Sequence, residues 1–188
     1  MKKAVLVMAI LGIVSGGVFA FDLMSYPPPV EGRDFLIDVA VGYAGAYGYS
    51  GSGTSLKIPP LSASVEYALP VSVPISVGGL FAFYQYEWDY GYSTYSYTWT
   101  YMFFGGRANW HWNFDISWLD LYTGAFIGYR YFKESYDGPT GWWYAEANYG
   151  GFTMGGQVGA HFYFTKNIGA LVETGYPFLI KAGLALKF

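Results

Sequence analysis

The chain ends in the stretch Ile180-Lys181-Ala182-Gly183-Leu184-Ala185-Leu186-Lys187-Phe188. Its even-numbered residues are all apolar, whereas its odd-numbered residues are lysine, glycine or alanine. Alternation with a period of two is typical of a β-strand, in which successive side chains point to opposite faces of the sheet. The pattern therefore predicts a strand with one apolar face and one face that carries charge.

The same alternation recurs upstream. Bulky apolar residues occupy one parity, and glycine, small or polar residues occupy the other, in residues 34–48, 61–69, 75–88, 95–112, 119–133, 147–164 and 168–176. In residues 95–112 the start of the pattern is ambiguous. If the strands form a membrane barrel, Arg107 and the residues of its parity must face inward, because a charge facing lipid at mid-depth costs about 2–4 kcal/mol. Together with the last stretch, these segments predict eight strands.

The connections between the segments alternate in length. Residues 49–60 are rich in Gly, Ser and Pro, and residues 134–141 contain Asp137-Gly138-Pro139, so both are predicted to be long loops. Residues 70–74 and 165–167 are predicted to be short turns. Long connections at one end and short ones at the other are typical of an antiparallel up-and-down barrel in an outer membrane.

The composition favours a membrane barrel over a soluble domain. Of the 188 residues, 53% are hydrophobic and only 12% are charged, whereas charged residues make up about a quarter of an ordinary soluble domain. No stretch after residue 21 provides the roughly 20 apolar residues of a membrane helix. The alternative fold is a soluble secreted barrel such as a lipocalin, but that fold would place the apolar face inside, and most segments here show the reverse.

The N-terminus predicts secretion. Met1-Lys2-Lys3 precedes an apolar stretch, and Val18 and Ala20 are small residues at the positions that a signal peptidase reads. Residues 1–20 are therefore predicted to be a cleaved signal peptide, residues 21–33 a periplasmic N-terminal segment and residues 34–188 the barrel domain. An uncleaved anchor helix is the alternative, although the apolar stretch is short for it.

Removal of residues 1–20 leaves 168 residues, with 8 basic residues against 13 acidic ones and a net charge of −5. That charge disfavours a nucleic acid as partner. Sixteen strands of about 10 residues each would use nearly the whole length, so the mature chain suits eight strands and excludes the large porins.

The C-terminal third carries a family resemblance. The last stretch, with Leu184, Leu186 and Phe188, resembles the signal that outer-membrane barrels present to the barrel-assembly machinery. Residues 147–188, above all 155–170 and 173–176, resemble small eight-stranded outer-membrane proteins of the OmpA-like, OmpX, OmpW and opacity superfamily.

This resemblance implies an all-β fold, a closed transmembrane antiparallel up-and-down barrel of eight strands, in the outer membrane of a double-membraned bacterium. It also implies outer-membrane lipids, the barrel-assembly machinery and periplasmic chaperones as partners. For OmpW-type barrels it implies passage of small hydrophobic molecules.

Inward-facing charges predict a filled lumen. An eight-stranded barrel is just wide enough for side chains to fill it, and buried charges persist when they are paired. Glu173 and Lys181 are equidistant from Pro177, so a tight hairpin would place them opposite each other, and Asp120 is also predicted to face inward. The predicted ionic network, a structural filling that leaves the lumen plugged, comprises Asp38, Glu66, Arg107, Arg130, Glu173 and Lys181.

Aromatic residues crowd the predicted outer hairpins and leave two functions open. Most would form an aromatic girdle at headgroup level. The excess would line a hydrophobic ligand mouth or form an adhesive surface, and the mouth is predicted from Tyr84, Tyr86, Trp88, Tyr101, Phe103 and Phe126. One function is therefore admission or binding of small hydrophobic molecules, and the other is a structural or surface-interaction barrel.

Catalysis has little support in the sequence. His111 and His161 are predicted to face inward, but they lack the spacing of a zinc site, and neither is followed by serine two residues on, as in outer-membrane lipid A deacylases. The glycine-rich residues 48–53 do not lie between a strand and a helix, so a phosphate cradle is not indicated. We expect no enzyme activity, no catalytic residue, no metal and no cofactor.

Overall fold

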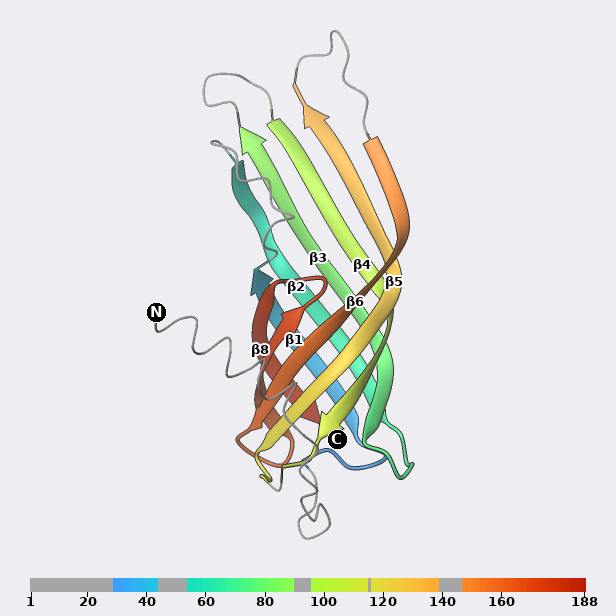
Figure 1. Ribbon diagram of the computed structural model, residues 1–188. Helices are drawn as coiled ribbons and strands as arrows, with labels where there is room; N and C mark the ends of the chain where they lie inside the picture. Colours follow the sequence, from blue (N-terminus) through green and yellow to red (C-terminus); the bar gives the residue numbers. More distant parts are fainter. Residues whose placement is uncertain (1–28, 44–53, 90–95, 115, 139–146) are drawn as a thin grey trace, which may run out of the picture.

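The described part of the chain forms a closed antiparallel barrel of eight strands (Figure 1). The computed structural model describes residues 29–43, 54–89, 96–114, 116–138 and 147–188. Each strand pairs with the next in sequence, and β1 closes the barrel against β8. The strands are β1 (Phe35–Tyr43), β2 (Thr54–Ala68), β3 (Ile75–Asp89), β4 (Ser96–Trp112), β5 (Leu119–Asp137), β6 (Ala147–Tyr163), β7 (Ile168–Gly175) and β8 (Ile180–Lys187). The predicted eight-stranded up-and-down barrel is thus confirmed.

The predicted signal peptide, residues 1–20, lies outside the described residues, as does most of the predicted N-terminal segment 21–33. Its described end lies against the bottom of the barrel, where Val30 packs with Leu36 and Ala68. In the described residues no helix is long and apolar enough to cross a membrane.

Two predicted loops are partly strand. β2 begins at Thr54 instead of residue 61, and β5 continues to Asp137 instead of ending at residue 133. β2 passes through Pro59 and Pro60, where its pairing with β3 shifts register, and β1 pairs only with residues 61–67 of β2. Because one edge of this part of β2 has no strand partner among the described residues, the prolines remove no ladder hydrogen bond on that side.

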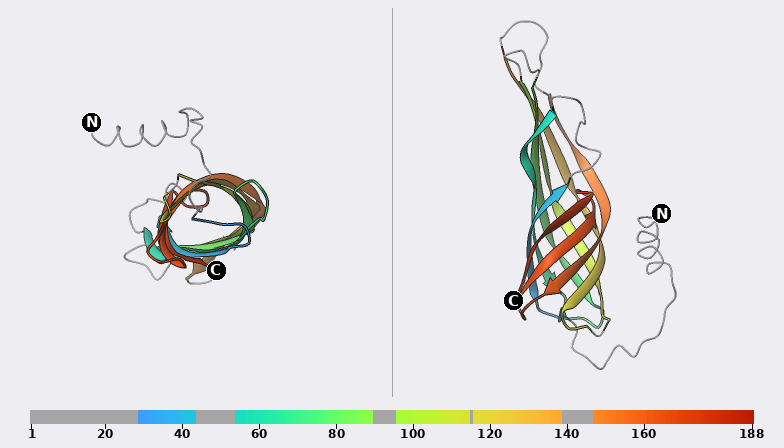
Figure 2. Two further views of the ribbon diagram at one scale, coloured as in Figure 1. Left: turned by 90° about the horizontal axis from the view of Figure 1, so that it is seen from below. Right: turned by 90° about the vertical axis from the view of Figure 1, so that its left-hand side faces the viewer.

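The strands differ greatly in length, which gives the molecule a closed lower part and an open upper part. β1, β7 and β8 have 9, 8 and 8 residues, whereas β2 to β6 have 15 to 19. β6 pairs with β5 from Ala147 onward but with β7 only from Gln157 onward. Strands β2 to β6 therefore extend beyond β1, β7 and β8. Their extensions form a curved sheet that we call the upper wall, with residues 54–60 of β2 at one edge and residues 147–156 of β6 at the other (Figures 1 and 2).

The outward face of the barrel is an exposed apolar belt. Ile127 and Met154 are 60% and 77% exposed, although both are large and apolar. At the upper border of the belt, the outward-facing register partners change from apolar or aromatic to polar. The highest apolar or aromatic set is Phe83, Met102 and Tyr131, and the outward-facing set above it is Gln85, Thr100, Lys133 and Asn148. Exposed aromatic residues mark the lower rim, at Trp110, Trp112, Trp118, Phe164 and Phe188. A belt with these two borders is typical of a transmembrane barrel.

Candidate functional site

A guanidinium at the centre of the closed barrel joins two carboxylates from other strands. Arg107 projects inward from β4, and its Nε lies 3.0 Å from Glu66 Oε1 on β2. Its Nη2 donates to Glu173 Oε2 on β7 at 2.9 Å. Lys181 is the direct register partner of Glu173, and its Nζ lies 2.8 Å from Glu173 Oε1. All four side chains are buried, so each charge has its partner inside the barrel.

The polar contacts continue downward through both histidines. Ser76 donates to Glu66, and its Oγ lies 2.9 Å from His111 Nε2. Asp120 joins the two imidazoles, because His111 Nδ1 lies 2.9 Å and His161 Nδ1 2.8 Å from its carboxylate oxygens.

Asp38 and Ser64 lead these contacts back to Arg107, whose Nη1 donates to Ser64 Oγ at 3.3 Å. His161 Nε2 lies 3.3 Å from Asp38 Oδ1 without hydrogen-bond alignment, and Ser64 donates to Asp38 Oδ2 at 3.1 Å. We call the whole set the polar network: Asp38, Glu66, Ser76, Arg107, His111, Asp120, His161, Glu173 and Lys181. It brings together all the predicted network residues except Arg130 and adds both histidines.

Sequence reasoning assigned no role to the histidines, although a signal was present. His161 is the register partner of Asp120, and both have inward parity in adjacent predicted strands. Buried polar groups need hydrogen-bond partners, and an inward carboxylate and an inward imidazole at the same height in a filled lumen can serve each other as partners.

Three members of the network have the order of a catalytic triad, but their contacts do not suit nucleophilic chemistry. The Ser76 hydroxyl donates to Glu66, so it does not donate to His111 Nε2 as a serine nucleophile does. Ser76 is fully buried. The cavity beside His111 and Asp120 measures about 10 Å³, the space of a single water. In the described residues no group of three or more His, Asp or Glu is arranged to hold a metal ion.

An aromatic layer lies above the polar network. Tyr84 and Phe103 are buried in the lumen with Ala82 and Phe178, and the Phe126 ring stacks on Tyr176 at 5.9 Å between centroids. We call these residues the aromatic plug: Ala82, Tyr84, Phe103, Phe126, Tyr176 and Phe178.

The aromatic plug corrects the predicted ligand mouth. Tyr84, Phe103 and Phe126 are at most 2% exposed, so they do not line an opening. The turn between β7 and β8 places Phe178 against Tyr84, with 6.0 Å between the ring centroids, and this fills the lumen at their height. Tyr86, Trp88 and Tyr101 lie higher on the inward face of the upper wall and are only partly buried.

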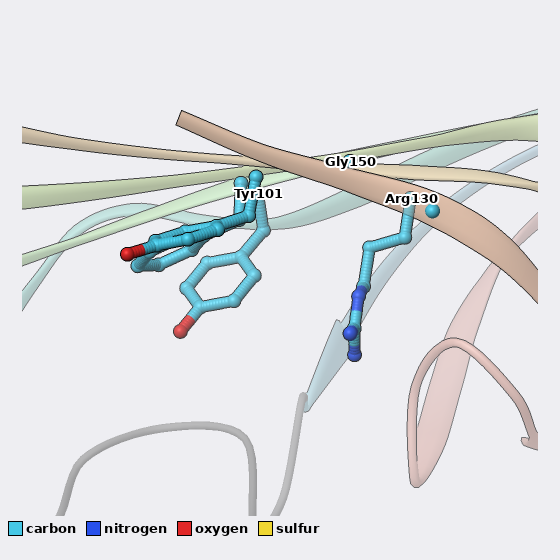
Figure 3. A pocket seen from close by; sticks show the side chains of 6 residues that line it. Tyr101, Arg130 and Gly150 are labelled. Atoms are coloured by element: carbon cyan, nitrogen blue, oxygen red, sulfur yellow. The ribbon is translucent and has the colours of Figure 1, made fainter. Parts of the chain in front are cut away.

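The inward face of the upper wall carries a row of rings. Tyr84, Tyr101, Phe132 and Tyr149 are successive register partners across β3, β4, β5 and β6. Their neighbouring ring centroids are 4.6, 4.9 and 6.1 Å apart. Beside this row lies a half-open pocket of about 350 Å³, lined by Tyr101, Arg130, Phe132, Tyr149, Gly150 and Gly151 (Figure 3).

Arg130 belongs to this pocket and not to the polar network, which corrects the prediction. Its parity is inward, as expected, but its side chain is exposed. Phe126, the register partner of Arg107, lies four residues away along β5, or about 13 Å. The aromatic plug separates the two guanidiniums. Arg130 makes no ion pair with any carboxylate in the part of the chain that the structure describes.

The predicted assembly residues Leu184 and Leu186 lie in the second half of β8, and Phe188 directly follows the strand. Leu184 and Phe188 are 59% and 64% exposed on the outward face. The Phe188 backbone exchanges two hydrogen bonds with Phe35, of 2.8 and 2.9 Å, and so completes the closure of the barrel.

Comparison with known proteins identifies the fold. No protein-family model matches the chain, and no curated protein does either. Among solved structures, the chain is similar to a major outer-membrane protein of Thermus thermophilus, with a TM-score of 0.57, 12% identity and coverage of 84% of this chain and 100% of that one.

It is also similar to the outer-membrane protein OprG of Pseudomonas aeruginosa, with a TM-score of 0.52, 12% identity and coverage of 84% and 97%. The attachment invasion locus protein Ail of Yersinia pestis gives a TM-score of 0.50, 14% identity and coverage of 85% and 100%. The chain therefore has the fold of small outer-membrane barrels.

Proposed function

We propose that this protein is an integral outer-membrane barrel, closed along its axis, that binds small hydrophobic molecules on the inward face of its upper wall. The observation that carries this proposal is the arrangement of inward residues. A polar network and an aromatic plug fill the lumen. Above them the partly or largely exposed rings of Tyr101, Phe132 and Tyr149 line a pocket of about 350 Å³. Ligand pockets are typically concave, mostly apolar and of at least about 300 Å³.

The exposed apolar belt supports location in a membrane, because a soluble protein would leave few large apolar side chains so exposed. The fold shared with outer-membrane proteins and the C-terminal alternation support the outer membrane of a double-membraned bacterium. The barrel is expected to fractionate with that membrane and to migrate faster on a gel before boiling than after. Purification as a soluble monomer without detergent would contradict this location.

A closed axis predicts that the barrel does not conduct ions. Arg107 and its two carboxylate partners block the centre, and Tyr84, Phe103 and Phe178 block the level above. The folded protein in a planar lipid bilayer is therefore expected to show no stable single-channel conductance. Well-resolved openings from protein whose gel migration shows that it is folded would contradict the closed axis.

Binding can be measured with a neutral ring, such as diethylaminocoumarin carboxamide, by fluorescence anisotropy in lipid nanodiscs. Signal above that of empty nanodiscs is expected, and Tyr149→Ala should lower it, because Tyr149 contributes a ring to the pocket. Phe104→Ala is the matched control, since Phe104 lies on the outward belt and its loss leaves the pocket unchanged. Equal binding by all three proteins and empty nanodiscs would contradict ligand binding.

A second candidate function is surface interaction through the upper wall. Its outward face is polar above the belt, where Lys57 pairs with Glu87 at 2.8 Å and Gln85 donates to Thr100 at 3.0 Å. A similar barrel is named as an attachment invasion locus protein. No ligand binding together with loss of cell attachment on deletion would favour this function. We also propose that the protein is not an enzyme, supported by the contacts of Ser76.

A further inference from the structure

We propose that the pocket at Arg130 takes a small molecule with one anionic group on a flat apolar ring, an aryl carboxylate in its simplest form. The inference rests on the proposed ligand binding and names its ligand class. Figure 3 shows that the Arg130 guanidinium and the Tyr101 ring project from the wall to the same side.

The guanidinium favours an anionic group. Arg130 lies among rings, and in the described residues it has no carboxylate partner. A guanidinium presents a fork of donors that matches the two oxygens of a carboxylate. Aromatic walls lower the local polarity, so an ion pair formed here is stronger than one in open water.

The pocket walls favour a flat ring. The planes of Phe132 and Tyr149 are only 23° apart, with 6.1 Å between the ring centroids. Tyr101 lies 4.9 Å from Phe132, tilted by 54° to it. A planar ligand ring can stack on the nearly parallel faces of Phe132 and Tyr149, because aromatic rings favour offset stacking.

Glycine provides the space for the ligand. Gly151 is the register partner of Arg130, and a Cβ added there would meet no atom within 4 Å. Because Gly151 lines the pocket and its Cβ position is open, we expect a larger side chain there to occupy the pocket and displace the ligand.

A single negative charge fits better than many. Among the described residues that line the pocket, Arg130 alone carries a positive charge. Glu134 has the same inward parity four residues further along β5 and pairs with Trp99 in register. A polyanion would therefore meet one cation and a nearby carboxylate, whereas a monoanion meets the cation alone.

The test compares two probes that share one ring, diethylaminocoumarin carboxylate and diethylaminocoumarin carboxamide, by anisotropy in nanodiscs of uncharged lipid. The wild-type protein is expected to bind the carboxylate more tightly than the carboxamide. Arg130→Gln should raise the Kd of the carboxylate by about tenfold or more and leave that of the carboxamide nearly unchanged. Gly151→Leu should abolish binding of both probes.

Gly156→Leu is the matched control, because Gly156 lies on the same strand with its face toward lipid, and the nearest atom to an added Cβ is 3.7 Å away. Heat-modifiable migration shows that each variant is folded. Equal affinity for the two probes, or an Arg130→Gln variant with unchanged preference, would overturn the ligand class while the proposed function stands. Binding of neither probe, or binding insensitive to Gly151→Leu, would overturn the proposed function as well.

Discussion

At the scale of single residues, Arg107 and Arg130 show that inward parity does not decide a charge's environment. Both side chains face the lumen side of their strands, yet one is 3% exposed and pairs with two carboxylates, and the other lines an open pocket. Alternation could predict the direction of each side chain. It could not predict that the aromatic plug would separate them, because this depends on Phe178 entering from the turn between β7 and β8.

The two arginines therefore give a matched prediction for stability. Arg107→Met should lower the free energy of unfolding by about 3–5 kcal/mol, because it leaves Glu66 and Glu173 buried without their main partner. Arg130→Met should change it by less than about 0.5 kcal/mol, as is usual for exposed positions. Urea unfolding of both variants in lipid vesicles measures the difference. Equal losses of stability would contradict the separation of the two environments.

At the scale of elements, register sets glycines opposite each other at positions where a side chain would meet the backbone of the neighbouring strand. Gly105 of β4 and Gly128 of β5 are register partners on the inward face. A Cβ added to Gly105 would lie 2.3 Å from the Ile127 carbonyl oxygen and 2.4 Å from Gly128 Cα. Both neighbours are backbone atoms, so neither can move aside cheaply. These glycines permit the close approach of two strands in a narrow barrel.

Neighbouring glycines on opposite faces allow a direct test. Gly105→Ala should destabilise the barrel by about 1–3 kcal/mol, the usual cost of overpacking. Gly106→Ala should have little effect, because the nearest atom to its added Cβ is 3.8 Å away on the outward face. Thermal unfolding in detergent, followed by gel migration, compares the two. A Gly105→Ala variant as stable as wild type would show that the strands do not approach as described.

Element boundaries were the weakest part of the sequence prediction. Residues 54–60 and 134–137 were predicted to be loop from their proline, glycine and charge content, but both continue strands of the upper wall. Outside the apolar belt, a strand needs no apolar face, so the alternation that marks the other strands is absent. Only the pairing with β3 and β4 shows that these residues are strand.

At the scale of the whole molecule, the two ends of the barrel chain meet at the lower rim. Phe188 closes the barrel through its backbone, whereas its side chain is 64% exposed and contributes little packing. The alternating C-terminus resembles an assembly signal, so we expect this side chain to matter for insertion more than for stability.

Phe188→Ser should lower the amount of folded protein in the outer membrane several-fold, while protein refolded in detergent should keep the wild-type unfolding temperature. Phe164→Ser is the control, because Phe164 is also an exposed aromatic residue at the same rim. Quantifying the heat-modifiable band in membrane fractions measures the effect. Equal losses in both variants would show that the rim as a whole matters, and not a C-terminal signal.

The sequence by itself determined the number and order of the strands and the direction of nearly every side chain in them. It could do so because period-two alternation is a local property of the backbone, and because an apolar belt must face lipid. Even the contact between Glu173 and Lys181 followed from their distance to one turn. Tertiary structure alone decided the height of each inward residue, the separation of Arg130 from the polar network and the filling of the predicted mouth. These features depend on register between strands and on the unequal lengths of β1, β7 and β8, which no single segment encodes.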